Sequence, residues 1–155
     1  YNCGTERITM GHSKEAIQKG DFSEAIAKAY YTGQGYTVLT ADTHETHYDF
    51  VTEKDGVFQK VQVKSCVLVE FPQNKGRNLV RIRNKRGQNG SYQEGDYDIL
   101  VGVWRDGGKM FFFESKDVIR DDLGETITVC REDGSDLEKR VKNRPLPFLV
   151  ETFAL

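Results

Sequence analysis

The dipeptide Asp55-Gly56, between two stretches rich in β-formers, is the feature that most constrains the fold. Asp-Gly favours a two-residue hairpin loop, because both central residues of the preferred turn take positive φ. With this loop Lys54 pairs with Val57, and every earlier residue has a fixed partner across the hairpin. A four-residue loop would shift the pairing by two residues and keep the same faces. The sequence therefore predicts an antiparallel pair over residues 47–53 and 57–69.

In this register the hairpin has one apolar and one polar face. The face that we expect to pack on the core is made by Tyr48, Phe50, Val61 and Val63. The polar face carries Asp49, Lys60, Gln62 and Lys64. A slip of one residue would scramble both faces, so the pattern itself supports the register. Asp49 then lies opposite Gln62, with their Cβ atoms about 4.5–5.5 Å apart.

This polar face contains the residue types that phosphate chemistry needs. Asp49 and the side-chain oxygen of Gln62 could bind one hard cation, with the backbone carbonyl of Val63 as a third oxygen ligand. Mg²⁺ accepts such sites, which have few protein ligands and several waters. Lys64 could orient a water or stabilise charge on a phosphate. A solvent-facing polar hairpin without chemistry is the alternative that the pattern leaves open.

Two helical stretches are predicted before the hairpin, over residues 13–19 and 21–32, with Gly20 between them. Asp21 and Glu24 have the spacing of a capping box at the start of the second helix. The apolar stripe of that helix would be Phe22, Ala25, Ile26 and Ala29. Glu24 could reach the polar face of the hairpin, complete the capping box, or do both.

The rest of the chain predicts further strands and one short helix. Strands are expected over residues 36–40, 78–83, 98–104, 109–113 and 125–130, and a helix over 116–121 capped by Ser115. Trp104 and Phe111–Phe113 are interpreted as core. This order indicates an α/β sandwich around a mixed sheet. The length of 155 residues predicts one domain over 1–155.

Composition excludes several classes of protein. No apolar run is long enough to span a membrane, and the N-terminal residues do not resemble a secretory signal, so we expect a cytoplasmic protein. The three cysteines, Cys3, Cys66 and Cys130, are widely spaced and odd in number. They predict reduced thiols rather than a disulfide framework or a zinc site.

The net charge of −2 hides one basic stretch between Pro72 and Gly95. This stretch contains one acidic residue, Glu94, and six basic residues: Lys75, Arg77, Arg81, Arg83, Lys85 and Arg86. Such a stretch is either a solvated face or a nucleic-acid contact. Residues 87–92 could be a loop that orders on DNA. Nearby polar residues could support the site or contact phosphate, namely His44, His47, Tyr92, Asp96 and Asp98.

Four motifs in this order resemble the PD-(D/E)XK nuclease superfamily. They are Lys19-Gly20-Asp21-Phe22-Ser23-Glu24, Gly35-Tyr36-Thr37-Val38, Tyr48-Asp49-Phe50 and Val61-Gln62-Val63-Lys64-Ser65. The chain looks most similar to the branch with small intron-encoded homing endonucleases, near the Holliday-junction resolvases. That branch often has a Lys-Gly-Asp-x-x-Glu helix, and Gln-Val-Lys where other members have Glu-x-Lys.

The resemblance implies a restriction-endonuclease-like α/β core, a mixed sheet flanked by helices, and Mg²⁺-dependent hydrolysis of DNA in which Mn²⁺ can substitute. Glu24 and Asp49 would bind the metal, Gln62 would take the third acidic position, and Lys64 would be catalytic. Two departures stand out: Tyr48 replaces the usual proline, and Gln62 removes one negative charge, although its carboxamide still offers an oxygen.

Site-specific, homing-type cleavage of double-stranded DNA is the function that this resemblance favours. A junction resolvase and a catalytically inactive DNA-binding module remain alternatives. One short chain presents one active site, so cutting two strands requires a homodimer or homotetramer. The exposed half of the Phe111 region or residues 146–150 could form the interface.

Overall fold

We describe a computed structural model of the chain, in which residues 14–70, 78–86, 90–120, 125–135, 139–141 and 144–154 are described. Helix α2 (Lys14–Gly33) precedes β1 (Thr37–Leu39), β2 (Phe50–Lys54), β3 (Val57–Ser65), β4 (Val67–Val69) and β5 (Leu79–Arg83). Next come β6 (Ile99–Trp104), β7 (Lys109–Glu114) and α3 (Ser115–Val118). The last strands are β8 (Thr126–Arg131), β9 (Lys139–Val141), β10 (Arg144–Leu146) and β11 (Leu149–Thr152).

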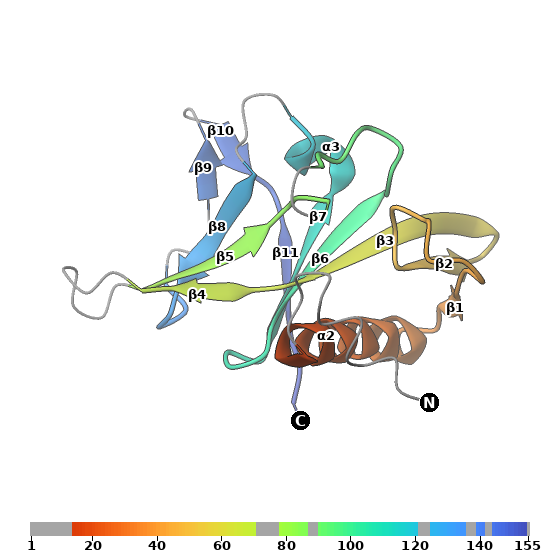
Figure 1. Cartoon of the computed structure of the whole chain (residues 1–155), viewed down its shortest axis with the longest axis horizontal. Coiled ribbons are helices and arrows are strands. Elements are labelled where there is room, and N and C mark those ends of the chain that lie inside the picture. Colours follow the sequence, from red (N-terminus) through yellow and green to blue (C-terminus); the bar gives the residue numbers. More distant parts are fainter. Residues whose placement is uncertain are drawn as a thin grey trace.

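A mixed six-stranded sheet in the order β1-β2-β3-β6-β7-β11 forms the centre of the fold (Figure 1). Strand β3 runs parallel to β6, and the other neighbours in this sheet are antiparallel. The hairpin has the predicted register, with Lys54 paired to Val57 and Phe50 to Val61. Asp55 and Gly56 take φ of 54° and 80°, as the two-residue loop requires. The predicted mixed α/β fold is therefore confirmed.

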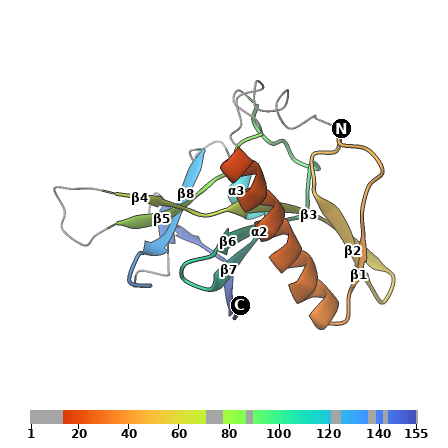
Figure 2. The same cartoon turned by 60° about the horizontal axis from the view of Figure 1, so that its bottom comes forward.

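Helix α2 lies across one face of this sheet (Figure 2). It is one continuous helix, so the predicted interruption at Gly20 and the capping box at Asp21 are wrong. Ser23, Ala27 and Tyr31 are its buried positions, spaced one turn apart. Glycine within a helix costs about 1 kcal/mol, which the packing of this face against the sheet offsets.

The predicted apolar stripe of α2 is only partly correct. Phe22 and Ile26 are half-buried, whereas Ala25 and Ala29 are exposed. The face that packs on the sheet consists instead of Ser23, Ala27 and Tyr31, with Tyr30 partly buried beside them. Under the helix lie Phe50, Val61, Val63, Val101, Val103 and Met110.

A three-stranded sheet, β4-β5-β8, packs over the other face of the central sheet. The single strand predicted over residues 57–69 divides at Cys66, where the chain leaves the central sheet and enters this second one. The core between the sheets includes Ile82, Leu100, Phe111, Phe113 and Ile127. Helix α2 therefore covers only one face of the central sheet, and the β4-β5-β8 sheet packs on the other face.

Gly102 on β6 allows the two sheets to approach closely. A Cβ atom at this position would lie 2.2 Å from Cδ1 and 2.8 Å from Cγ1 of the fully buried Ile82. We expect Gly102→Ala to lower the free energy of unfolding by about 1–3 kcal/mol, because the core must shift. Gly20→Ala is the control: it has open space in a helix interior and should raise stability by up to about 1 kcal/mol. Urea denaturation measures both, and an unchanged midpoint for Gly102→Ala would contradict the close approach.

The last part of the described chain corrects the predicted helix cap. Ser115 begins α3 instead of capping it, and Glu114 occupies the N-cap position without a side-chain cap. Phe111 and Phe113 are buried core residues as predicted, and Phe112 is half-buried. Strand β11 pairs along β7, and its Leu149 is 71% exposed. Cys66 and Cys130 are buried free thiols as predicted, and Cys3 lies outside the described residues.

Candidate active site

The candidate site lies where β2 and β3 stop pairing with each other, a place in the central sheet that we call the fork. Strand β2 starts at Phe50, whereas β3 continues to Ser65 beside β6. Asp49 lies at this fork, where its amide donates to the Val61 carbonyl (2.8 Å). The amide of Val63 in turn donates to Oδ2 of the Asp49 carboxylate (2.7 Å). Asp49 is therefore held against β3, across from Gln62 as the hairpin register predicts.

Glu24 reaches the same fork from α2. The hydroxyl groups of Ser23 and Ser65 lie 2.6 Å apart and attach the helix to the end of β3. Burial raises the pKa of Asp49 to about 6, the Val63 hydrogen bond opposes this, and the charge of Glu24 raises it further. The Glu24 carboxylate also forms an ion pair with Lys28 (2.9 Å). Because Glu24 lies in the middle of a helix, its predicted capping role is wrong.

Gln62 and the Val63 carbonyl complete the predicted set of oxygen atoms. Gln62 is buried, with 9% of its surface exposed. Its Nε2 donates a long hydrogen bond, 3.4 Å, to the Val63 carbonyl. This contact engages the amide nitrogen and leaves the carboxamide oxygen Oε1 as an acceptor for a ligand.

Lys64 extends from β3 into a partly closed environment. Its Nζ donates to the Lys85 carbonyl (2.8 Å) and lies 5.2 Å from the centre of the Tyr92 ring. Burial lowers the pKa of Lys64, while the Asp49 carboxylate raises it and the charge of Arg83 lowers it. A buried ammonium near a carboxylate is a group that can exchange protons with a bound water.

The donor set fits a hard divalent cation. Within the described residues no three or more His, Cys, Asp or Glu side chains gather as a metal site. The oxygen donors are instead two carboxylates, the Gln62 carboxamide and the Val63 carbonyl, a chemistry that suits Mg²⁺. Burial and the neighbouring Glu24 carboxylate raise the pKa of Asp49, while Lys64 and Lys28 lower it.

A family model for PD-(D/E)XK endonucleases matches residues 14–144. The chain belongs to this PD-(D/E)XK endonuclease family. Protein 5.3 of Escherichia phage T7 is 36% identical over 84 residues, which cover 54% of this chain and 69% of that protein. The bacterial homing endonuclease I-Ssp6803I has a similar structure, with a TM-score of 0.65 and 23% identity, over 86% of this chain and 89% of that one. Family membership identifies the chain as a nuclease, a class of hydrolase.

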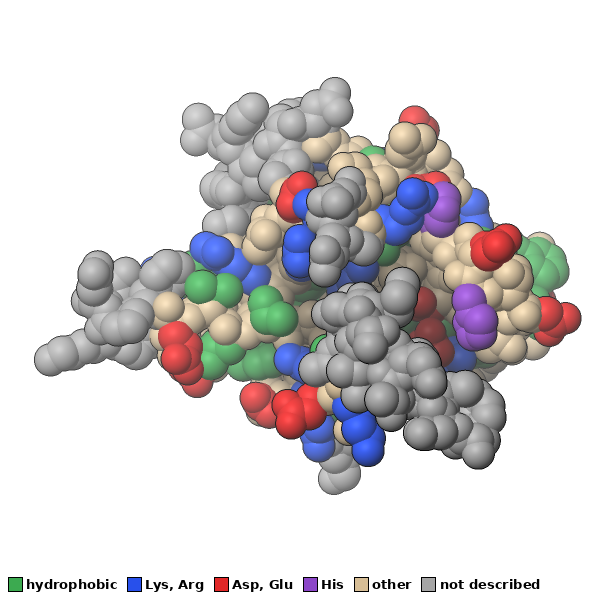
Figure 3. All heavy atoms as spheres, viewed as in Figure 1, with side chains coloured by type: hydrophobic (Ala, Val, Ile, Leu, Met, Phe, Trp, Pro, Cys, Tyr) green, Lys and Arg blue, Asp and Glu red, His purple; other side chains and the backbone are tan. Residues whose placement is uncertain are grey.

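The basic residues of this PD-(D/E)XK endonuclease have different surroundings. On the face in Figure 3, Lys and Arg side chains gather along the middle of the molecule. Arg83 is exposed, whereas Arg81 donates to the Thr128 hydroxyl (3.1 Å) and Lys85 pairs with Glu125 (3.1 Å). Lys75 and Arg77, and residues 87–89 of the predicted loop, lie outside the described residues. Of the four described cations, Arg83 and Arg86 are exposed, whereas Arg81 and Lys85 are half-buried.

Arg86 is held by His47, on the loop before Asp49. Arg86 Nη1 donates to His47 Nε2 (2.7 Å), and His47 Nδ1 lies 2.9 Å from Asp96 Oδ1. Since arginine only donates and a carboxylate only accepts, these contacts fit the tautomer of His47 that carries its proton on Nδ1. Burial raises the pKa of the Asp96 carboxyl. Hydrogen bonds from the Gln93 amide and from His47 outweigh burial and hold this pKa below its ordinary value.

We expect His47→Ala to weaken binding of duplex DNA about three- to tenfold, because Arg86 loses the group that positions it. His47→Gln keeps a side-chain acceptor and should restore part of the affinity. His44→Ala is the matched control, since His44 is an exposed histidine on the same loop. Fluorescence anisotropy with a labelled duplex measures the three affinities. Equal loss for His47→Gln and His47→Ala would contradict the role of the acceptor.

Several residues around this site were not singled out by sequence reasoning. Lys28 pairs with Glu24 and lowers the pKa of Asp49. Ser65 connects the end of β3 to α2. Lys28 is one helical turn after Glu24, so the spacing could have indicated the ion pair. No sequence signal connects Ser65 to Ser23, because they are distant in the chain.

Proposed function

We propose that this PD-(D/E)XK endonuclease hydrolyses DNA phosphodiester bonds at the fork between β2 and β3, with a divalent cation. The observation that carries the proposal is the convergence of Asp49, Glu24 and Lys64 from three elements on one spot. Glu24, Asp49, Gln62 and the Val63 carbonyl would hold the cation, Mg²⁺ or Mn²⁺. When bound, the cation supplies Lewis-acid polarisation and lowers the pKa of water.

The protein side chains then have separate tasks in this proposal. The Lys64 ammonium positions the attacking water and stabilises negative charge on the phosphate. Asp49, fixed by the Val63 amide, would present its carboxylate to the cation. Lys28 holds the Glu24 carboxylate in position through their ion pair. Arg83 and Arg86 bind phosphates away from the scissile bond.

The preferred substrate in this proposal is a specific double-stranded site in bacterial or phage-infected cells. The structural similarity to a bacterial homing endonuclease supports this choice, and the phage relative supports a mobile or phage context. Cutting both strands would take a homodimer or homotetramer. The exposed Leu149 on the edge strand β11 is a candidate contact.

A structure-specific nuclease is the second candidate. A hollow lined by Lys19, Trp104 and Arg105 favours DNA with unpaired nucleotides over a uniform duplex. The inactive alternative depends on Gln62, since a neutral carboxamide weakens the metal site relative to a carboxylate. Both alternatives keep the same fold and predict DNA binding, so cleavage assays must distinguish them.

Incubation with supercoiled plasmid and with a four-way junction, in Mg²⁺, Mn²⁺ or EDTA, tests the proposal. We expect cation-dependent cleavage, and the preferred substrate separates the two active candidates. Gln62→Glu should increase general nicking if the missing charge limits the metal site. No cleavage by wild type or by Gln62→Glu, on either substrate, would favour the inactive module.

A further inference from the structure

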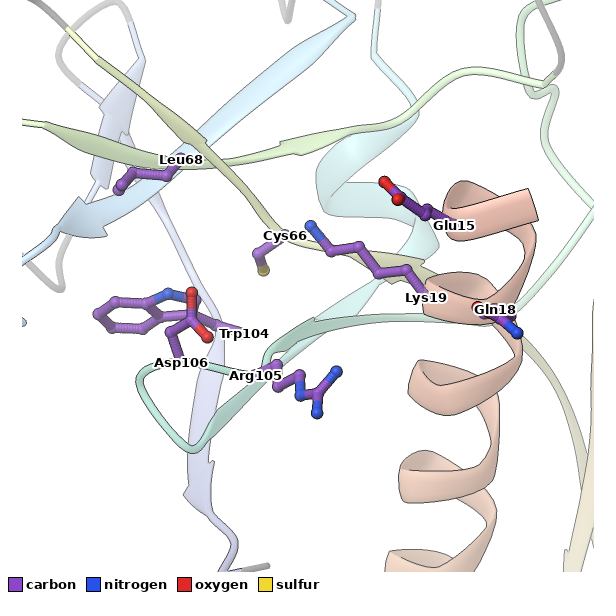
Figure 4. A pocket seen from close by; sticks show the side chains of 8 residues that line it. All are labelled: Glu15, Gln18, Lys19, Cys66, Leu68, Trp104, Arg105 and Asp106. Atoms are coloured by element: carbon purple, nitrogen blue, oxygen red, sulfur yellow. The ribbon is translucent and has the colours of Figure 1, made fainter. Parts of the chain in front are cut away.

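A hollow lies between the first half of α2, β4 and the turn that joins β6 to β7. Figure 4 shows Lys19 extending from α2 toward Cys66, with Trp104 on the opposite wall. We call it the Trp104 pocket, and its volume is about 440 Å³. Its walls include Lys19, Cys66, Leu68, Trp104, Arg105 and Asp106.

The walls of the Trp104 pocket combine apolar surface with charges of both signs. Cys66, Leu68 and Trp104 form an apolar side, and burial raises the pKa of the Cys66 thiol, which keeps it neutral. The Arg105 guanidinium lies 4.6 Å from the centre of the Phe22 ring, which holds it at the rim. Among the described residues no carboxylate forms an ion pair with Lys19 or Arg105. Both cations can therefore bind an anion.

The pocket is connected to the candidate active site through the backbone. Ser65 lies between Lys64 and Cys66, and its hydroxyl donates to the Lys19 carbonyl (3.3 Å). Two residues along a strand span about 6.8 Å, so the pocket wall and the catalytic lysine are close neighbours. On the helix, Lys19 precedes Glu24 by five residues. A DNA strand at Lys64 would have its next nucleotides near the pocket.

We propose that the Trp104 pocket receives a nucleotide freed from base pairing, on the strand being cut. A nucleotide has a flat base, polar atoms on its edge and an anionic phosphate. The apolar wall suits the base, Glu15 and Asp106 can accept from the base edge, and Lys19 and Arg105 suit the phosphate. Stacked bases inside a duplex cannot enter a hollow, whereas an unpaired nucleotide can. This inference rests on the proposed endonuclease function and favours its second candidate, a structure-specific nuclease.

The single tryptophan of the chain makes the proposal directly testable. Two hairpin DNAs share one duplex sequence: one is blunt, and the other carries a short single-stranded extension at either its 5′ or its 3′ end. Both are titrated in EDTA, so that no cleavage occurs, while Trp104 emission and the anisotropy of labelled DNA are recorded. We expect the extended DNA to bind about tenfold more tightly and to change the emission, and the blunt DNA to leave the emission unchanged.

Substitutions outside the catalytic set locate the binding. Lys19→Ala and Arg105→Ala should remove the preference for extended DNA. Lys14→Ala, which removes an equal charge from the same helix outside the pocket, should keep it. An emission change that survives both pocket substitutions would overturn the proposal, as would equal affinity for the two DNAs without a change in emission. Failure of both DNAs to bind would overturn the proposed function itself.

Discussion

We expect Lys64→Ala to slow DNA cleavage by about 10²–10³-fold, the usual effect of removing one group that stabilises transition-state charge. The ammonium is buried at the end of β3, between the Lys85 carbonyl and the Tyr92 ring. Lys64→Arg should not restore the rate, because a guanidinium is larger and presents its donors in a rigid planar fork instead of as a compact ammonium. Cleavage of plasmid in Mg²⁺ measures the rate, and anisotropy measures DNA binding.

Lys60→Ala is the matched control for Lys64→Ala. Lys60 lies on the same strand and the same face, and its Nζ donates to the Gly95 carbonyl. We expect this substitution to change the cleavage rate less than about threefold, within the range of a surface contact. DNA binding by Lys64→Ala should persist, since phosphate contacts elsewhere supply most of the affinity. Equal loss of cleavage in both variants would show that Lys64 has no special role.

Asp49→Asn should abolish cleavage and at the same time stabilise the metal-free chain near neutral pH. The folded carboxyl has a pKa of about 6 against an ordinary 3.8, a difference equal to about 3 kcal/mol. Because the raised pKa favours protonation of the folded chain, Asp49 contributes most to the free energy of unfolding below about pH 4. This contribution is lost as the pH rises through about 6. Asparagine carries no charge and can still accept from the Val63 amide.

Urea denaturation of the metal-free chain tests this expectation. Asp49→Asn should raise the free energy of unfolding by about 1–3 kcal/mol near pH 8 and by almost nothing near pH 4. Asp42→Asn, an exposed aspartate on the loop before Asp49, should change neither value. Lower stability of Asp49→Asn near pH 8 would contradict the expectation that burial destabilises the ionised Asp49 carboxylate.

The sequence was sufficient for the local part of this site. Asp55-Gly56 specifies the hairpin loop, and strand alternation then places Asp49 across from Gln62, because a strand has only two faces. Strands β2 and β3 are joined by only two loop residues, so the register of their pairing is determined locally. The same reasoning correctly indicated the mixed α/β class and the buried strand β6.

Tertiary packing decided what local patterns could not. Gly20 and the Asp21-x-x-Glu24 spacing resemble a helix start, yet burial of Ser23, Ala27 and Tyr31 against the sheet keeps α2 continuous and turns Glu24 toward Asp49. Likewise Arg86 is a cation of a basic stretch in the sequence, and only the fold places it on His47. Capping and charge patterns are local preferences of about 1 kcal/mol, whereas packing of distant elements decides which side chains finally meet.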